Sequence, residues 1–240
     1  MGETLQRMEA LLGHAAMDKL RHSHVAVVGL GGVGSWAAEA LCRAGVGTLT
    51  LLDSDTVSRS NINRQLYALH STVGIPKAEA AAARCRDIRE DVTVYPIVGT
   101  YDALHRELLF CRHYDYIVDC IDLVSCKLDL IEQARQRDIP ILCALGTGNK
   151  LKAQQLQVAD ISKTYGCPLA RVMRKELRNR GITHLKVVFS PEEAHTAQQT
   201  EAPPQGRRSV PGSVVWVPAA AGLLMAQTVV EDLTEGMVRQ

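Results

Sequence analysis

The sequence predicts an α/β fold built on a Rossmann-like, doubly wound and mostly parallel β-sheet. Short runs of β-branched and aliphatic residues alternate with longer segments of helical spacing over the first 150 residues. The first of these runs ends in the glycine-rich stretch GLGGVGS at 29–35, and a polar stretch, DSDTVSRSNINRQ, follows the second. Because such sheets bind their ligands at the carboxyl ends of the strands, we expect the functional residues at that edge.

The expected elements follow one another in regular order. Apolar spacing predicts a first helix over 5–20, and the continuous run HVAVVGL predicts a buried strand at 24–30. Further helices are expected at 33–45, 76–89, 102–111, 125–137 and 168–180, with an Ala-rich helix near the C-terminus. Further strands are expected at 48–53, 92–98, 114–122, 139–146, 154–161, 185–190 and 213–218, the C-terminal ones antiparallel.

Composition limits the class of protein. Hydrophobic residues make up 46% of the 240 residues, which is enough for a sizeable core, and a net charge of +1 excludes a uniformly basic protein. The seven cysteines form no CxxC pair, and the longest apolar stretch is interrupted by Pro218 and Gln227. We therefore expect a cytoplasmic protein that does not span a membrane. Residues 190–212 are polar and contain four prolines, which predicts a mobile loop.

The glycine-rich stretch has the spacing of a dinucleotide-binding loop. Gly29, Gly31 and Gly34 satisfy G-x-G-x-x-G between an expected strand and helix, and Gly32 lies within the same loop. Asp53 ends the next strand, where a ribose hydroxyl would bind. The glycines let backbone N–H groups approach phosphates closely. Taken alone, the loop also fits an NAD(P)-dependent oxidoreductase, a nucleotide sensor, or only a tight strand-to-helix turn.

The polar stretch after the second strand favours ATP. It supplies Asp55, Asn61, Asn63, Arg64 and Gln65, and Lys77 opens the next expected helix. A site that cleaves a triphosphate needs cations and amides around it, whereas the nicotinamide side of a dehydrogenase is largely apolar. The alternative is a solvated loop that covers the edge of the sheet.

Four segments in this order resemble the ThiF/MoeB/HesA superfamily, the bacterial relatives of the ubiquitin-activating E1 enzymes: VAVVGLGGVGS, LTLLDSDTVSRSNINRQ, VGIPKAE and VDCID. The resemblance implies an E1-like adenylation fold that binds ATP and Mg²⁺. Members of this superfamily convert a carboxylate into an acyl adenylate and release pyrophosphate. The resemblance also implies one domain over 1–240, with a nucleotide-binding part at 1–150 and a substrate and dimer part at 151–240.

The same resemblance implies roles for individual residues. The glycine loop would hold phosphates and Asp53 the ribose, while the residues that would line the triphosphate, with Gln65 beside them, are Asp55, Asn61, Arg64 and Lys77. Asp122 matches the aspartate that acts through Mg²⁺, but Leu123 replaces the usual Asn or Ser. Arg7 matches an arginine that reaches into the partner's ATP site in these homodimers; alternatively, it is simply solvated.

The second half of the chain indicates the branch of the superfamily. Without CxxC pairs the chain lacks the structural zinc site of ThiF and MoeB, which makes a sulfur-carrier substrate less favoured. Residues 146–182 and 209–233 resemble the tRNA threonylcarbamoyladenosine dehydratases. This implies adenylation of the threonyl carboxylate on tRNA, ring closure with loss of water, and a possible sulfur-relay protein as partner. The alternative is an E1-like activator of the C-terminus of a small ubiquitin-like or sulfur-carrier protein.

A basic stripe and one cysteine complete the candidate residues. Arg171, Arg174, Lys175 and Arg178 recur at helical spacing and would share one face of the helix 168–180. Such a face pairs with tRNA phosphates or is merely solvated. Cys167 precedes Pro168 at the expected helix start, where a thiol pKa is often lowered, so it is a candidate thioester nucleophile. Ring closure within the substrate would require no such nucleophile.

Overall fold

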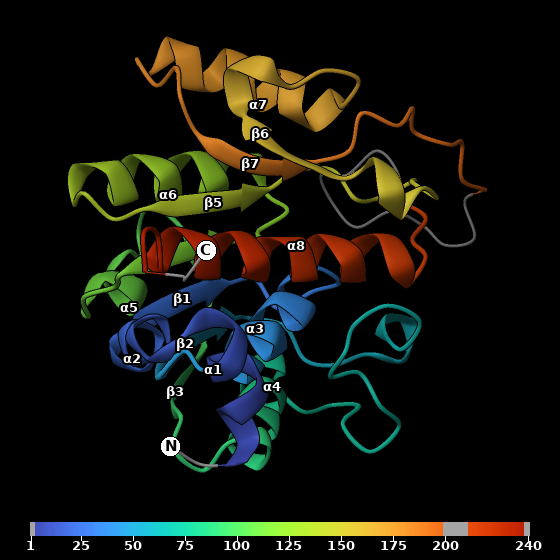
Figure 1. Cartoon of the computed structure of the whole chain (residues 1–240). Helices are drawn as coiled ribbons and strands as arrows, with labels where there is room; N and C mark the ends of the chain where they lie inside the picture. Colours follow the sequence, from blue (N-terminus) through green and yellow to red (C-terminus); the bar gives the residue numbers. More distant parts are fainter. Residues whose placement is uncertain (1–2, 199–210, 238–240) are drawn as a thin grey trace.

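The computed structural model describes residues 3–198 and 211–237, and its centre is one twisted sheet (Figure 1). Within these residues the sheet has seven strands in the order β3-β2-β1-β4-β5-β7-β6. Their bounds are β1 (His24–Val28), β2 (Thr48–Asp53), β3 (Thr93–Val98), β4 (Tyr116–Asp119), β5 (Ile141–Ala144), β6 (Gln157–Asp160) and β7 (Lys186–Phe189). All neighbours are parallel except β6 and β7. The predicted sheet, with its antiparallel C-terminal part, is confirmed.

Helices cover both faces of this sheet. Their bounds are α1 (Gln6–Leu12), α2 (His14–His22), α3 (Gly34–Arg43), α4 (Lys77–Ile88), α5 (Glu107–Phe110), α6 (Val124–Gln136), α7 (Pro168–Asn179) and α8 (Trp216–Leu233). Side chains alternate along the strands, so Val25 and Val27 pack in the core with α3, α4 and α8. Ala26 and Val28 point the other way, into the core with α5 and α6. The single helix predicted at 5–20 is interrupted at Gly13, whose φ of 85° is not helical.

The segment 213–218 was expected to be a strand, and this prediction is wrong. Residues 211–214 have no regular structure, and α8 begins at Trp216. Every fourth residue from Val217 to Val229 is fully buried, which is a helical period that the apolar letters SVVWVP alone do not reveal. Pro218 lies in the first turn, where a helix tolerates proline.

The C-terminal helix α8 runs across the middle of the molecule beside α3 (Figure 1). Gly222 makes this close packing possible. A Cβ atom there would lie 2.5 Å from the Val33 carbonyl oxygen and 2.7 Å from the Trp36 Cβ. The last helix of the chain therefore buttresses the helix that carries the glycine loop.

The strand order reverses between β1 and β4. From β1 the chain moves outward to β2 and β3, and then returns to place β4 on the other side of β1. Loops after β1 and β4 therefore diverge at the carboxyl edge and leave a crevice, the usual ligand site of such sheets. Among the described helices, none is long and apolar enough to cross a membrane.

The loop predicted at 190–212 is only partly described, since 199–210 lie outside the described residues. Its first part is packed onto the protein. The Glu192 side chain is 6% exposed and accepts N–H bonds from Leu151 (3.0 Å) and Lys152 (2.9 Å). The buried Lys150 amine donates to the Ser190 carbonyl at 3.4 Å. The start of this segment is therefore anchored.

Candidate active site

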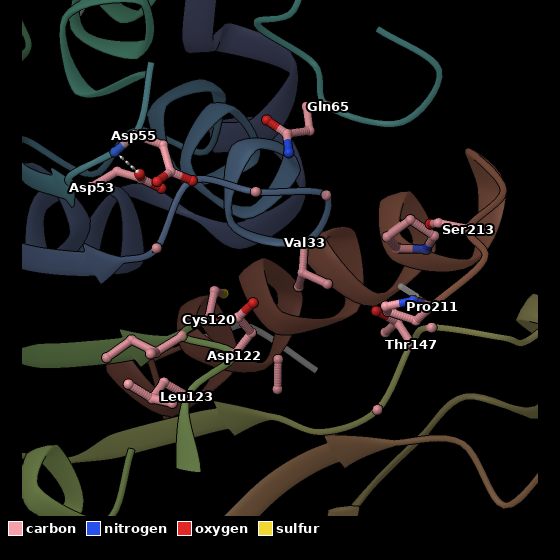
Figure 2. A pocket seen from close by; sticks show the side chains of 18 of the residues that line it. Val33, Asp53, Asp55, Gln65, Cys120, Asp122, Leu123, Thr147, Pro211 and Ser213 are labelled. Carbon is pink, nitrogen blue, oxygen red and sulfur yellow. Dashed lines mark hydrogen bonds between the residues drawn. The ribbon is translucent and has the colours of Figure 1, made fainter. Parts of the chain in front are cut away.

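A cleft of about 880 Å³ opens at the carboxyl edge of the sheet, where the strand order reverses. One side, here called the glycine-loop wall, comprises Gly29, 31–33, 53–55, Asn61, Arg64, Gln65 and Lys77. The other side, here called the α7 wall, comprises 146–148, 167–169 and 211–213. Residues 120–123, which follow β4, form the floor. Figure 2 shows Asp53, Asp55 and Gln65 on one side, Thr147, Pro211 and Ser213 on the other, and Asp122 on the floor.

The glycines of the loop have different structural roles. A Cβ on Gly34 would lie 1.8 Å from the Gly29 carbonyl oxygen, so Gly34 lets α3 start against the strand end, and it does not itself line the cleft. Gly29 has a φ of 89° and packs against the floor. Gly31 and Gly32 do line the cleft, and the nearest protein atom to a Cβ on Gly31 would be 3.9 Å away. The backbone at Gly31 is therefore open to a ligand.

Asp53 ties the glycine loop to the end of β2. Its carboxylate accepts the N–H of Leu30 at 2.6 Å and that of Asp55 at 2.8 Å. Burial raises the pKa of Asp53, and the nearby Lys77 charge and the two N–H bonds offset part of that rise. The carboxylate thus lies at the cleft in the position that the Rossmann pattern assigns to ribose recognition.

Lys77 and Asp55 form an ion pair at the edge of the cleft. The Lys77 amine lies 2.7 Å from the Asp55 carboxylate, and the Lys77 backbone N–H also donates to the Asp55 carbonyl at 2.9 Å. Only 7% of the Lys77 side chain is exposed, compared with 67% of the Asp55 side chain. The cation is therefore held in a mostly buried position by a carboxylate that reaches solvent.

The loop 61–66 brings amides and a guanidinium to the same wall. Asn61 and Gln65 are buried, and the Arg64 guanidinium donates to the Ser60 carbonyl at 2.8 Å. The indole N–H of Trp36 donates to the Arg64 carbonyl at 3.2 Å, which fastens the loop to α3. All the residues expected around the triphosphate thus line one cleft. Such a set of donors can bind and polarise a polyphosphate.

The α7 wall is built by contacts that sequence reasoning missed. Asn149 adopts the left-handed region with a φ of 58°, and its side chain accepts the Gly212 N–H at 2.6 Å. Its backbone donates to the Gly212 carbonyl at 2.8 Å and accepts from His195 at 2.9 Å. The Asn63 amide donates to the Ser213 carbonyl at 3.1 Å, joining this wall to the opposite one. No local motif signals these contacts, because they join distant segments.

Cys167 caps the start of α7. Its sulfur accepts the Ala170 N–H at 3.5 Å, and only 4% of the residue is exposed. A Cβ on Gly146 would lie 2.7 Å from this sulfur, so the thiol fills the space beside that glycine. The structure gives Cys167 a capping contact.

The remaining expected residues lie outside the cleft. Arg7 is exposed on α1 and does not line the cleft of its own chain. Arg171, Lys175 and Arg178 are exposed on α7. Arg174 is half-buried instead, because its guanidinium donates to both the carbonyl and the hydroxyl of Thr164 at 2.7 Å. Among the described residues, no group of three or more His, Cys, Asp or Glu side chains could hold a metal ion.

Comparisons with known proteins agree with this geometry. A model of the ThiF family matches residues 4–236. The tRNA threonylcarbamoyladenosine dehydratase of Bacillus subtilis (strain 168) is 40% identical over 236 residues, which cover 95% of this chain and 93% of that protein. The enzyme of the same name from Escherichia coli (strain K12) is 42% identical over 171 residues, or 70% of this chain and 63% of that protein. The molybdopterin-synthase adenylyltransferase of E. coli is 38% identical over 125 residues, about half of each chain.

Solved structures show the same fold. The crystal structure of E. coli tRNA N6-threonylcarbamoyladenosine dehydratase, TcdA, in complex with ATP has a TM-score of 0.86 at 32% identity, covering 97% of this chain and 94% of that one. The structure of the same enzyme with AMP has a TM-score of 0.84 at 33% identity, covering 98% and 93%. These likenesses confirm the predicted E1-like fold.

Proposed function

The chain belongs to the ThiF family, and from this premise we propose that it is an ATP-dependent tRNA threonylcarbamoyladenosine dehydratase. The observation that carries the proposal is the 40% identity to the B. subtilis dehydratase over 95% of the chain. Similarity to the E. coli molybdopterin-synthase adenylyltransferase covers only 52% of the chain, which favours the dehydratase over that activity. Because the proposed substrate is a tRNA, we propose that the protein acts in the cytoplasm.

The glycine-loop wall holds ATP in this proposal. Backbone N–H groups of the loop and the start of α3 would receive phosphates, and the Asp53 carboxylate would accept hydroxyl hydrogens of the ribose. Lys77 and Arg64 would supply positive charge to the triphosphate, with Asn61 and Gln65 as polar neighbours. The placement of all these groups along one wall supports the assignment.

Magnesium fits this site as an ion carried by the nucleotide. Mg²⁺ is usually held by one or two carboxylates together with substrate phosphates, so it needs no cage of protein ligands. The described residues contain no such cage, while the Asp122 carboxylate lies on the floor of the cleft. When bound, Mg²⁺ would neutralise charge that develops on the phosphates. We propose Asp122 as the residue that holds it.

The chemistry proceeds in two steps. The threonyl carboxylate attacks the α-phosphorus, a new P–O bond forms, and the bond to pyrophosphate breaks. An atom of the neighbouring carbamoyl group then attacks the activated carbonyl carbon, loses its proton and expels AMP, which carries one carboxylate oxygen away. The sum is loss of water from the substrate, driven by hydrolysis of ATP to AMP and pyrophosphate. Lys77 and Arg64 stabilise the negative charge of the first step, and no protein nucleophile is needed.

Three partners complete the proposal. The exposed cations of α7 would contact tRNA phosphates. A homodimer would let Arg7 of one subunit reach the ATP site of its partner, which agrees with the exposure of Arg7 outside its own cleft. A sulfur-relay protein would be an accessory partner of the same enzyme.

A pyrophosphate-exchange assay tests the function. The purified protein is incubated with ATP, Mg²⁺ and labelled pyrophosphate, with either threonylcarbamoylated tRNA or small sulfur-carrier proteins added. We expect exchange that depends on the modified tRNA and is absent with unmodified tRNA. Exchange that only a carrier protein stimulates would establish the E1-like alternative instead. Stabilisation against heat by NAD in preference to ATP with Mg²⁺ would favour the oxidoreductase class.

A further inference from the structure

We propose that the buried ion pair between Asp119 and Lys127 is a positioning unit that fixes the floor of the cleft and thereby aims the Asp122 carboxylate at the nucleotide-bound cation. This inference rests on the proposed function, because it takes Asp122 as the residue that holds Mg²⁺. Neither Asp119 nor Lys127 lines the cleft, so neither is a catalytic residue.

The pair holds both backbone polar groups of one residue, Ile121. The Lys127 amine lies 2.9 Å from the Asp119 carboxylate, and both side chains are fully buried. The other Asp119 oxygen accepts the Ile121 N–H at 3.0 Å, and the Lys127 amine donates to the Ile121 carbonyl, also at 3.0 Å. Both backbone polar groups of Ile121 are therefore held. Asp122 is the next residue along the chain, so its starting direction is set by this arrangement.

The glycine loop rests on the same segment. A Cβ on Gly29 would lie 2.7 Å from the Cys120 carbonyl oxygen and 3.1 Å from the Ile121 nitrogen. A Cβ on Gly34 would lie 3.2 Å from the Cys120 Cβ. A shift of the segment 120–121 would therefore move both the carboxylate on the floor and the loop expected to hold phosphates.

A gain in stability does not by itself explain the buried pair. Removing two charges from water costs several kcal/mol per ion, and replacing such a pair by apolar residues of similar volume is often neutral or stabilising. Burial lowers the pKa of Lys127, but the charge and hydrogen bond of the adjacent Asp119 carboxylate, together with the nearby Cys143 and Cys120, raise that pKa overall, so the amine stays charged. A role in positioning Asp122 accounts for the presence of two buried charges at this place.

The test separates stability from positioning by a double replacement. The variants are Lys127→Met, the double variant Asp119→Leu with Lys127→Met, and Asp122→Asn; Lys186→Met, which breaks an exposed ion pair with Asp232, is the matched control. Thermal unfolding reports stability. Calorimetric titration with ATP, in EDTA and again in Mg²⁺, reports how far the cation tightens nucleotide binding without requiring turnover.

We expect Lys127→Met to lower the unfolding temperature, because it leaves the Asp119 charge buried without its partner. The double variant should regain stability and bind ATP in EDTA almost as the wild type does. Its gain in affinity from Mg²⁺ should nevertheless fall by about tenfold or more, the effect typical of removing outer-sphere support from a metal ligand. Asp122→Asn should show the same loss, and Lys186→Met none.

A double variant that is stable and keeps the full Mg²⁺ effect would overturn the positioning role. If Asp122→Asn keeps that effect while exchange with modified tRNA is observed, the assignment of Mg²⁺ to Asp122 is wrong and this inference falls with it. The proposed dehydratase function would survive that result. If the wild-type protein shows no pyrophosphate exchange that depends on modified tRNA, the proposed dehydratase function is refuted instead.

Discussion

The two walls of the cleft are constructed in opposite ways. On the glycine-loop wall, the contacts that position Leu30 on Asp53 and Lys77 on Asp55 join residues 23 and 22 positions apart. At the α7 wall, the contact of Asn149 with Gly212 spans 63 positions, and the contact of Asn63 with Ser213, which joins this wall to the opposite one, spans 150. The first wall follows from strand ends and the turns beside them, whereas the second exists only after distant loops have closed on one another. The glycine-loop wall can therefore be predicted from local sequence, but the α7 wall cannot.

The largest effect is expected from Lys77→Ala on the glycine-loop wall. Loss of one preorganised cation beside the triphosphate should lower kcat for adenylation by about 100- to 1000-fold. The partner Asp55 is mostly exposed and can be solvated, so the unfolding temperature should change little. Single-turnover release of pyrophosphate measures the effect, and Arg135→Ala, an exposed cation on α6, is the control. Retained activity in Lys77→Ala would remove this residue from the site.

Two glycine variants distinguish a structural role of the glycine loop from a role in ligand binding. Gly34→Ala forces a Cβ into the Gly29 carbonyl, so it should cost about 3 kcal/mol and lower Tm by roughly 6 to 12 °C. Gly31→Ala meets no protein atom closer than 3.9 Å, so it should leave Tm unchanged and weaken ATP binding alone. Thermal melts with and without ATP measure both effects. Equal melting temperatures for the two variants would contradict this division.

Asn149 tests whether the α7 wall serves the acceptor. Asn149→Gly keeps the left-handed backbone but loses the side-chain bond to Gly212, and Asn149→Ala also adds about 1 to 2 kcal/mol of backbone strain. Both variants should raise KM for modified tRNA several-fold while Kd for ATP stays constant; only Asn149→Ala should be less stable. A parallel rise in both constants would mean that the two walls do not act separately.

The smallest effects are expected on the surface of α7. Arg171→Ala, Lys175→Ala and Arg178→Ala should each weaken tRNA binding modestly and lower its salt slope by about 1. Arg174→Ala should act mainly on stability, since its guanidinium already bonds Thr164. Binding to tRNA over a range of salt concentrations measures the slopes, with Arg135→Ala on α6 as control. An unchanged slope in all three variants would identify the stripe as a solvated face.

The comparison also explains what the sequence could predict. Continuous apolar runs such as HVAVV indicate buried strands, and GLGGVG indicates the turn after the first strand, so the sheet could be predicted correctly. The same local signals are the reason that the residues of the glycine-loop wall could be predicted to lie together. The segment at 213–218 was expected to be a strand because its apolar run has no visible period, and only packing against α3 selects the helix that starts at Trp216. Gly13 interrupts the first helix because its backbone adopts a positive φ, which the spacing of apolar residues does not reveal. The burial of Lys127 could not be predicted either, because a lysine in a helix normally faces solvent.

The close packing of α8 on α3 determines when, during synthesis, the ATP site can form. Chains emerge from the ribosome N-terminus first, so the glycine loop and its helix appear long before Gly222 and the residues that bury Ala37 and Leu41. Until α8 has been synthesised, the apolar side of α3 that it covers stays exposed to solvent. We therefore expect that the nascent chain binds no nucleotide and that chaperones bind it. Premature termination after Leu123 and before Trp216 would thus yield a product that keeps the glycine loop, Lys77 and Asp122 but lacks α8, and we expect it to bind no ATP.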